Sequence, residues 1–262
     1  MTIVLIASVL YLLSTALPVR RLAHAGPGMP LAVWSMPTVA TLLHAAAHLL
    51  AWREAGGANL HVFSALSLVA LGMAALALLV GARGRMAALG VIVFPIAAAM
   101  LLAYGLFGRH DPKPMDWRVQ LHAWCALLAY ATLAIAALLA MLSWAQERAL
   151  RKRNLNGWLR ALPPLVELET LLFRTIAVGF TLLTTTLLTG VLFIEDLLAQ
   201  HLAHKTVFSV LSWLAFGALL LGRWRYGWRG AKALRWTLIA MALLLLAFFG
   251  SNLVLELLLQ RR

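Results

Sequence analysis

The chain of 262 residues is poor in cysteine and in charge. Its single cysteine, Cys125, excludes an internal disulfide and any paired-cysteine redox or zinc motif. Packing as a small apolar side chain is the simplest role for it. Charged residues make up only 12% of the sequence. With so few charged residues, no stretch of the sequence is typical of a soluble domain.

Acidic residues are especially scarce, with nine in the whole chain. A proton-coupled transporter normally carries several carboxylates inside its membrane spans. Here the predicted spans hold few, and the clearest is Glu256, with Asn252 one turn before it. The sequence therefore disfavours a permease for small solutes or metal ions.

What the chain has instead is a series of long apolar runs, and 63% of its residues are hydrophobic. Each run of about 20 residues can cross a hydrocarbon core of ~30 Å at ~1.5 Å per residue. The predicted fold class is all-α, a polytopic membrane helix bundle. Eight spans are expected, at roughly residues 2–19, 31–52, 60–81, 86–107, 119–144, 170–194, 205–222 and 233–258. The first is expected to be a retained span, because no basic residue precedes it and no small-residue cleavage pattern follows it.

Basic residues predict the orientation of these spans. Thirteen lysines and arginines fall in the odd-numbered connections, which the positive-inside rule places in the cytoplasm. Both termini are then on the outer side of the membrane. The same distribution explains the formal net charge of +13 without a nucleic-acid partner, so the lipid bilayer is the expected partner.

With this orientation, seven of the eight histidines lie toward the outer face. His122 begins a long apolar helix and has aromatic residues on either side. It could be an interface anchor, a packed polar residue or an axial ligand for a metal or haem. His44 and His48 lie four residues apart on one face of the second span, where ionisable groups are costly without a partner or a cofactor. No zinc-binding motif accompanies them, and their helix has no carboxylate or cysteine to complete a metal shell.

A stripe of threonines marks the sixth predicted span. Thr181, Thr185 and Thr189 recur every four residues on one face, with Gly190 beside them. We interpret this stripe as a surface for interhelical packing and hydrogen bonding rather than as a permeation path.

Four stretches of the sequence carry a resemblance to a known family. They are Val119–His122 with Leu127–Ala131, Glu169–Leu171 with Phe173–Arg174 and Gly179–Gly190, Lys205 with Ser212–Leu214, and Gly227–Gly230 with Phe249–Leu253. These stretches resemble the cytochrome c assembly protein family of haem-handling membrane proteins, of the CcsA and CcmC type, and in particular its smaller YpjD-like or HemX-like inner-membrane branch. The resemblance implies a bacterial inner (cytoplasmic) membrane, in which both termini are periplasmic. The region of resemblance is 117–262, and residues 1–110 hold less specific helices. We expect all of 1–262 to form a single membrane domain.

The resemblance implies a helix bundle that binds haem near the outer leaflet for attachment to cytochromes c. His122 matches the first outer-face haem histidine of the family. The second such histidine is expected near Leu259 and an intramembrane one near Leu221, and both positions are leucine here. The tryptophan-rich motif expected before Lys205 is replaced by the stretch 195–204.

A haem site needs one or two axial ligands, an apolar slot and cations for the propionates. His122 is the expected first ligand, with His44 or His204 on the other side, and no metal other than haem iron is expected. Arg118 or Lys205 could pair with propionates. Three tryptophans could flank the slot or belong to the interface belt: Trp52, Trp117 and Trp124.

The predicted function is therefore non-enzymatic: binding or positioning haem for cytochrome c maturation or haem homeostasis. Other cytochrome c maturation membrane proteins are the partners that this function implies. A second hypothesis is a membrane assembly or scaffold subunit that has lost haem binding, which the leucines near 221 and 259 favour.

Overall fold

The computed structural model describes residues 1–22, 32–55, 61–81, 87–108, 116–153, 159, 162–193 and 203–250. These residues form eight α-helices and no strand, so the predicted all-α class is confirmed. Several predicted features lie outside the described residues, namely His24, His110, His201, Asn252, Glu256 and Leu259.

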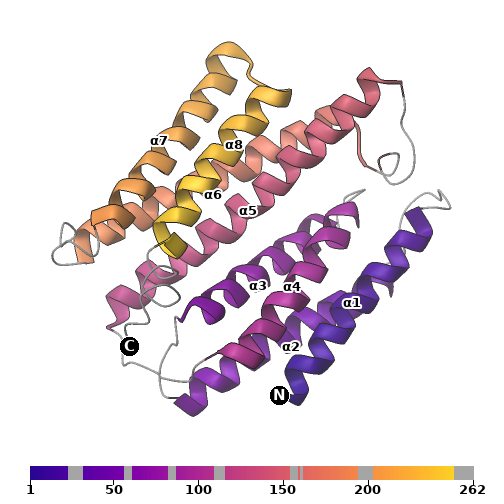
Figure 1. The fold of residues 1–262 in the computed structure, drawn as a ribbon, viewed down its shortest axis with the longest axis vertical. Helices are drawn as coiled ribbons and strands as arrows, with labels where there is room; N and C mark the ends of the chain where they lie inside the picture. Colours follow the sequence, from indigo (N-terminus) through magenta and orange to yellow (C-terminus); the bar gives the residue numbers. More distant parts are fainter. Residues whose placement is uncertain are drawn as a thin grey trace. The chain divides into compact units, whose positions relative to one another are not determined.

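The helices follow the apolar runs of the sequence (Figure 1). They are α1 (Thr2–Leu22), α2 (Ala32–Ala55), α3 (Val62–Gly81), α4 (Ala87–Phe107), α5 (Trp117–Arg151), α6 (Leu165–Phe193), α7 (Ala203–Tyr226) and α8 (Gly230–Leu245). Within the described residues, seven helices are long and apolar enough to cross a membrane, and the apolar part of α1, Thr2–Thr15, is shorter. The chain is therefore a multi-pass helical membrane protein.

Two helices begin or end well beyond the predicted spans. Helix α5 runs on to Arg151 as a basic extension, where Arg151 pairs with Glu147 one turn earlier at 2.7 Å. Helix α6 begins at Leu165, directly after Pro163 and Pro164, because proline fits the start of a helix but not its interior.

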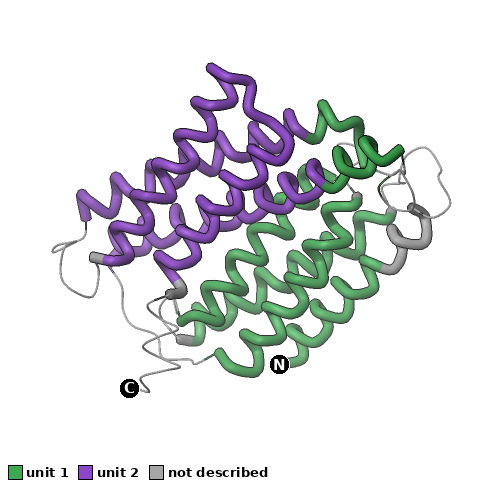
Figure 2. The backbone as a smooth tube through the Cα atoms, turned by 45° about the horizontal axis from the view of Figure 1, so that its top comes forward, with its two compact units in different colours: residues 1–115, 145–168 green, residues 116–144, 169–262 purple. Residues whose placement is uncertain are grey.

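The described chain divides into two compact units (Figure 2). Unit 1 comprises Met1–Met115 with Ala145–Leu168, and unit 2 comprises Asp116–Trp144 with Glu169–Arg262. The boundary at residues 115 and 116 coincides with the start of the region that carries the family resemblance. That the two units form a single membrane domain stays a prediction.

Unit 1 contains α1 to α4, in which α1 packs on α2 and α4, and α3 packs on α2 and α4. Alanines and a few aromatic side chains fill the space between these helices. Tyr11 of α1 stacks on Phe94 of α4 with ring centroids 5.8 Å apart, and both side chains are fully buried. A polar network that includes Tyr11 crosses this core.

Unit 2 contains most of α5 and α6 together with α7 and α8, and its helices are joined by side-chain hydrogen bonds. Trp213 of α7 donates to Thr184 of α6 at 2.9 Å, and Ser212 of α7 donates to the carbonyl of Ala240 in α8 at 2.7 Å. In a membrane such bonds hold helices together where the hydrophobic effect between them is weak. Gly179 of α6 lies against Leu133 of α5, with no space for a larger side chain.

Candidate functional site

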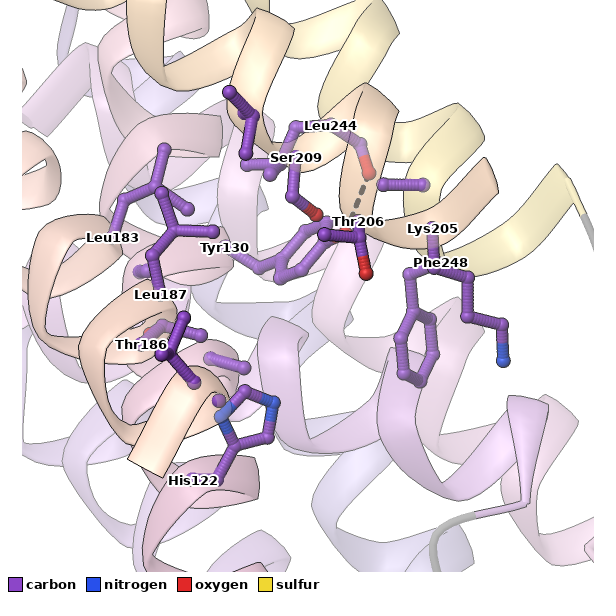
Figure 3. A pocket seen from close by; sticks show the side chains of 16 residues that line it. His122, Tyr130, Leu183, Thr186, Leu187, Lys205, Thr206, Ser209, Leu244 and Phe248 are labelled. Atoms are coloured by element: carbon purple, nitrogen blue, oxygen red, sulfur yellow. Dashed lines mark hydrogen bonds between the residues drawn. The ribbon is translucent and has the colours of Figure 1, made fainter. Parts of the chain in front are cut away.

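A cavity of about 220 Å³ lies inside unit 2, where the ends of four helices meet (Figure 3). Its lining comes from the first part of α5, the last part of α6, the first part of α7 and the end of α8. Because consecutive spans alternate in direction, these four parts belong to the same end of the bundle. Most of the lining is apolar, and the polar side chains in it are His122, Tyr130, Thr186, Lys205, Thr206 and Ser209.

His122, predicted to be the first haem ligand, is in this cavity. Its Nδ1 lies 3.2 Å from the hydroxyl oxygen of Thr189 in α6. A methyl group at Gly190 would lie 3.2 Å from Cε1 of the imidazole ring, so the ring sits directly on the helix at this glycine. Figure 3 shows one ring nitrogen on the side of α6 and the other on the side of the cavity where Phe248 lies.

Tyr130 shapes the far wall of the cavity. Its hydroxyl donates to the carbonyl of Leu244 in α8 at 2.5 Å, which is the dashed bond in Figure 3. Directly after Leu245 the helix widens into a π-helical turn, Leu246–Gly250. This turn supplies Ala247 and Phe248 to the lining. Turns of this kind are rare and occur frequently at functional sites.

Of the two cations predicted to meet propionates, Lys205 lines the cavity and Arg118 does not. The Arg118 guanidinium instead lies 5.7 Å from the centre of the Trp117 ring. No tryptophan of the described residues lines the cavity, so the first of the two alternatives for these tryptophans, that they flank a slot, has no support at this site. Trp117, at 63% exposed, and the less exposed Trp52 and Trp124 fit the interface belt.

His204, a predicted second ligand, lies half-buried in the first turn of α7 beside Lys205. It is not among the residues that line the cavity. Its role as an iron ligand stays a prediction.

His44, the other predicted second ligand, is fully buried in unit 1. Its Nδ1 lies 3.4 Å from the Tyr11 hydroxyl, and its Nε2 lies 2.9 Å from the hydroxyl of Ser67. The Nε2 of His48 lies 2.9 Å from the same Ser67 oxygen. Tyr11 also donates to Thr41 at 3.1 Å. Both ring nitrogens of His44 therefore face protein partners, and its role as an iron ligand stays a prediction.

The threonine stripe on α6 is divided by the structure. Thr181 and Thr185 are exposed and donate to carbonyls of their own helix, so the prediction of interhelical bonds is wrong for these two. Thr189 alone of the three meets another helix, through His122. The pairing of Thr189 with His122 was not predicted. The available signal was Thr189 followed by Gly190, a hydroxyl beside a position without a side chain.

The fold and the site define a class: a polytopic helical membrane protein with a largely apolar cavity at one end of a four-helix unit, which holds one imidazole and one lysine. Residues 32–259 match the cytochrome c assembly protein family. The chain belongs to that family. The match begins further toward the N-terminus than the four stretches of resemblance recognised in the sequence.

The chain is also similar to individual proteins. The chain is 30% identical over 262 residues to the Escherichia coli K12 "Inner membrane protein YpjD", which covers 97% of each chain. It is 32% identical over 88 residues to "Cytochrome c biogenesis protein CcsA" of Prochlorococcus marinus, covering 33% of this chain and 28% of that one. It is 26% identical over 131 residues to "Protein HemX" of Brevibacillus brevis, covering 49% and 48%. No solved structure matches the chain.

Proposed function

We propose that this protein binds haem in the cavity of unit 2 and positions it near the outer face of a bacterial inner membrane, for cytochrome c maturation or haem homeostasis. The observation that carries this proposal is that the cavity combines an imidazole, apolar walls and a cation in a chain of the cytochrome c assembly family. The protein would act by binding rather than by bond-breaking catalysis, with both termini on the periplasmic side.

The side chains in the cavity fit haem in their chemistry. His122 offers a ring nitrogen that is turned away from α6, and imidazole nitrogen is a common axial ligand of haem iron. Lys205 lies in the same lining and could pair with a propionate, while leucine, valine and alanine side chains suit an apolar macrocycle. When bound, haem would supply the iron that this nitrogen coordinates.

The volume sets a limit on how haem could be held. About 220 Å³ is less than the ~300–1,000 Å³ of pockets that enclose a drug-sized ligand. The cavity is partly open, and Val191 in its lining is 68% exposed. The cavity would therefore cover part of the macrocycle and leave the rest outside the enclosed space, which suits a protein that must also release it.

The test is haem titration of the detergent-purified protein, followed by absorption spectroscopy in the Soret region. We expect wild type to develop a shifted Soret band, and His122→Ala to lose that shift and to bind haem more weakly. His44→Ala and His204→Ala are the matched histidine deletions. The one that changes the spectrum identifies a second ligand, and His44→Ala is expected to leave it unchanged because both its ring nitrogens already face protein partners.

A wild-type protein that fails to take up haem would overturn the haem proposal and leave the scaffold function. One observation favours that second candidate: Leu221, at the position expected to hold an intramembrane histidine, is 57% exposed on α7 and does not line the cavity. The scaffold candidate predicts co-purification with other membrane proteins of cytochrome c maturation in a haem-free state.

A further inference from the structure

The Thr189 hydroxyl donates its proton to carbonyl groups of its own helix. The Thr189 hydroxyl oxygen lies 2.9 Å from the carbonyl of Thr185 and 3.0 Å from the carbonyl of Thr186. A carbonyl can only accept, and a threonine hydroxyl has one proton to donate. Both carbonyls are closer to this oxygen than Nδ1 of His122 is, at 3.2 Å. The oxygen is therefore left to accept a hydrogen bond from the imidazole.

The acceptor role of Thr189 fixes the tautomer of His122. A nitrogen that faces this oxygen must carry the proton. In a neutral imidazole the other nitrogen, Nε2, then keeps a free lone pair.

We propose that Thr189 is a positioning residue that holds His122 as the Nδ1–H tautomer, so that Nε2 presents a lone pair to the cavity. The proposal names a role for Thr189 within the proposed haem site and rests on that function for the identity of the ligand. Residues that orient a metal-binding histidine through its second nitrogen typically change metal affinity about 10–100-fold when they are mutated.

Gly190 completes the arrangement by letting the ring approach α6. With a methyl group 3.2 Å from Cε1, the ring would have to move away from the helix and lengthen its bond to Thr189. Thr189 and Gly190 therefore act together, one by hydrogen bonding and the other by its lack of a side chain.

The first measurement is the tautomer of His122 in the haem-free protein, from the imidazole nitrogen shifts of a sample labelled with ¹⁵N-histidine. The His122→Gln spectrum assigns the signals by difference. We expect Nδ1–H in wild type, a shift toward Nε2–H in Thr189→Val, and the wild-type pattern in Thr189→Ser, which keeps the hydroxyl. Thr181→Val is the matched control, because Thr181 is an exposed threonine on the same helix and bonds only its own helix.

A wild-type His122 in the Nε2–H form would overturn the proposal even if a variant failed to fold. An unchanged tautomer in folded Thr189→Val would also overturn it. The second measurement is haem titration, in which Thr189→Val is expected to bind about 10–100-fold more weakly than Thr189→Ser and Thr181→Val. If wild type binds no haem, the proposed function fails, while the tautomer result still decides the role of Thr189.

Discussion

The two units each contain a histidine that the sequence singles out, and the two imidazoles are treated in opposite ways. In unit 1, both ring nitrogens of His44 face protein hydroxyls and the side chain is fully buried. In unit 2, His122 uses Nδ1 against Thr189 and turns its other nitrogen toward a cavity. A histidine whose hydrogen bonds are all made within the protein supports packing, whereas one with a nitrogen left over can bind a ligand.

The surroundings of the two rings differ as well. Ser67 lies 2.9 Å from a nitrogen of His44 and of His48, and the His48 ring stacks on Tyr104 with centroids 4.3 Å apart. Ser67 has one proton to donate, so it accepts a hydrogen bond from at least one of the two histidines. We call this network closed because each partner named in it is a protein group. The cavity around His122 is mainly apolar and partly open.

Removing His44 is expected to have the largest effect on stability. His44→Ala leaves a cavity and strips partners from Tyr11 and Ser67, so unfolding free energy should fall by about 3 kcal/mol. Thermal denaturation of the detergent-solubilised protein measures this. His122→Ala, at a half-buried site beside an existing cavity, should cost about 1 kcal/mol or less. Equal losses of unfolding free energy in the two variants would contradict the conclusion that His44 supports packing and His122 does not.

Ser67→Ala tests the closed network without deleting a ring. Each imidazole loses its Nε2 partner, and the expected loss of stability is about 1–3 kcal/mol, the range for a buried polar group left unsatisfied. Ser64→Ala is the control, because the buried Ser64 hydroxyl has no hydrogen-bond partner among the described residues. If Ser64→Ala lost as much stability as Ser67→Ala, the hydrogen bonds of Ser67 to the two histidines would contribute little to stability.

Gly190→Ala should disturb ligand binding in unit 2 more than stability. The added methyl group moves the His122 ring off α6, and we expect haem affinity to fall about tenfold, within the range for altered orientation of a metal ligand. Gly217→Ala is the matched control, since a methyl group there would lie 3.4 Å from Phe180, an ordinary contact. Unchanged haem affinity in Gly190→Ala would show that the ring does not depend on this approach.

Lys205→Met gives the smallest expected effect. It removes a charge near the cavity and keeps most of the side-chain volume, so haem affinity should fall only about three- to fivefold, a size typical of a partly exposed ion pair. The dependence of binding on salt concentration should weaken at the same time. Lys232→Met is the control, because Lys232 lies in the first turn of α8 and the cavity lies at the other end of that helix. A salt dependence that persists in Lys205→Met would assign the propionates to another cation.

The eight helices could be predicted because each span needs about 20 apolar residues, a signal that is local in sequence. Boundaries were less predictable where polar residues belong to a helix, as at the acidic start of α6, which begins at Leu165 rather than near residue 170. His122 could be singled out because it begins an apolar helix between aromatic residues and matches a haem histidine of the family, and its role as a ligand stays a prediction. Its pairing with Thr189 could not be predicted, because that contact depends on how α5 and α6 are rotated against each other. The same reason applies to Ser67, which is unremarkable in sequence and joins two histidines in the structure.

The short connection between α7 and α8 has a consequence for the order of events during synthesis. Three residues, Gly227–Arg229, join the two helices, and the Trp228 ring lies against Gly222, where no side chain fits. Two helices closed so tightly are suited to enter the bilayer together as a hairpin. Lys205 and Phe248 lie toward the ends of that hairpin away from the turn, and both line the cavity. The nascent chain would thus expose His122 long before the cavity around it is complete, so a ligand can be enclosed only after the last hairpin has been made.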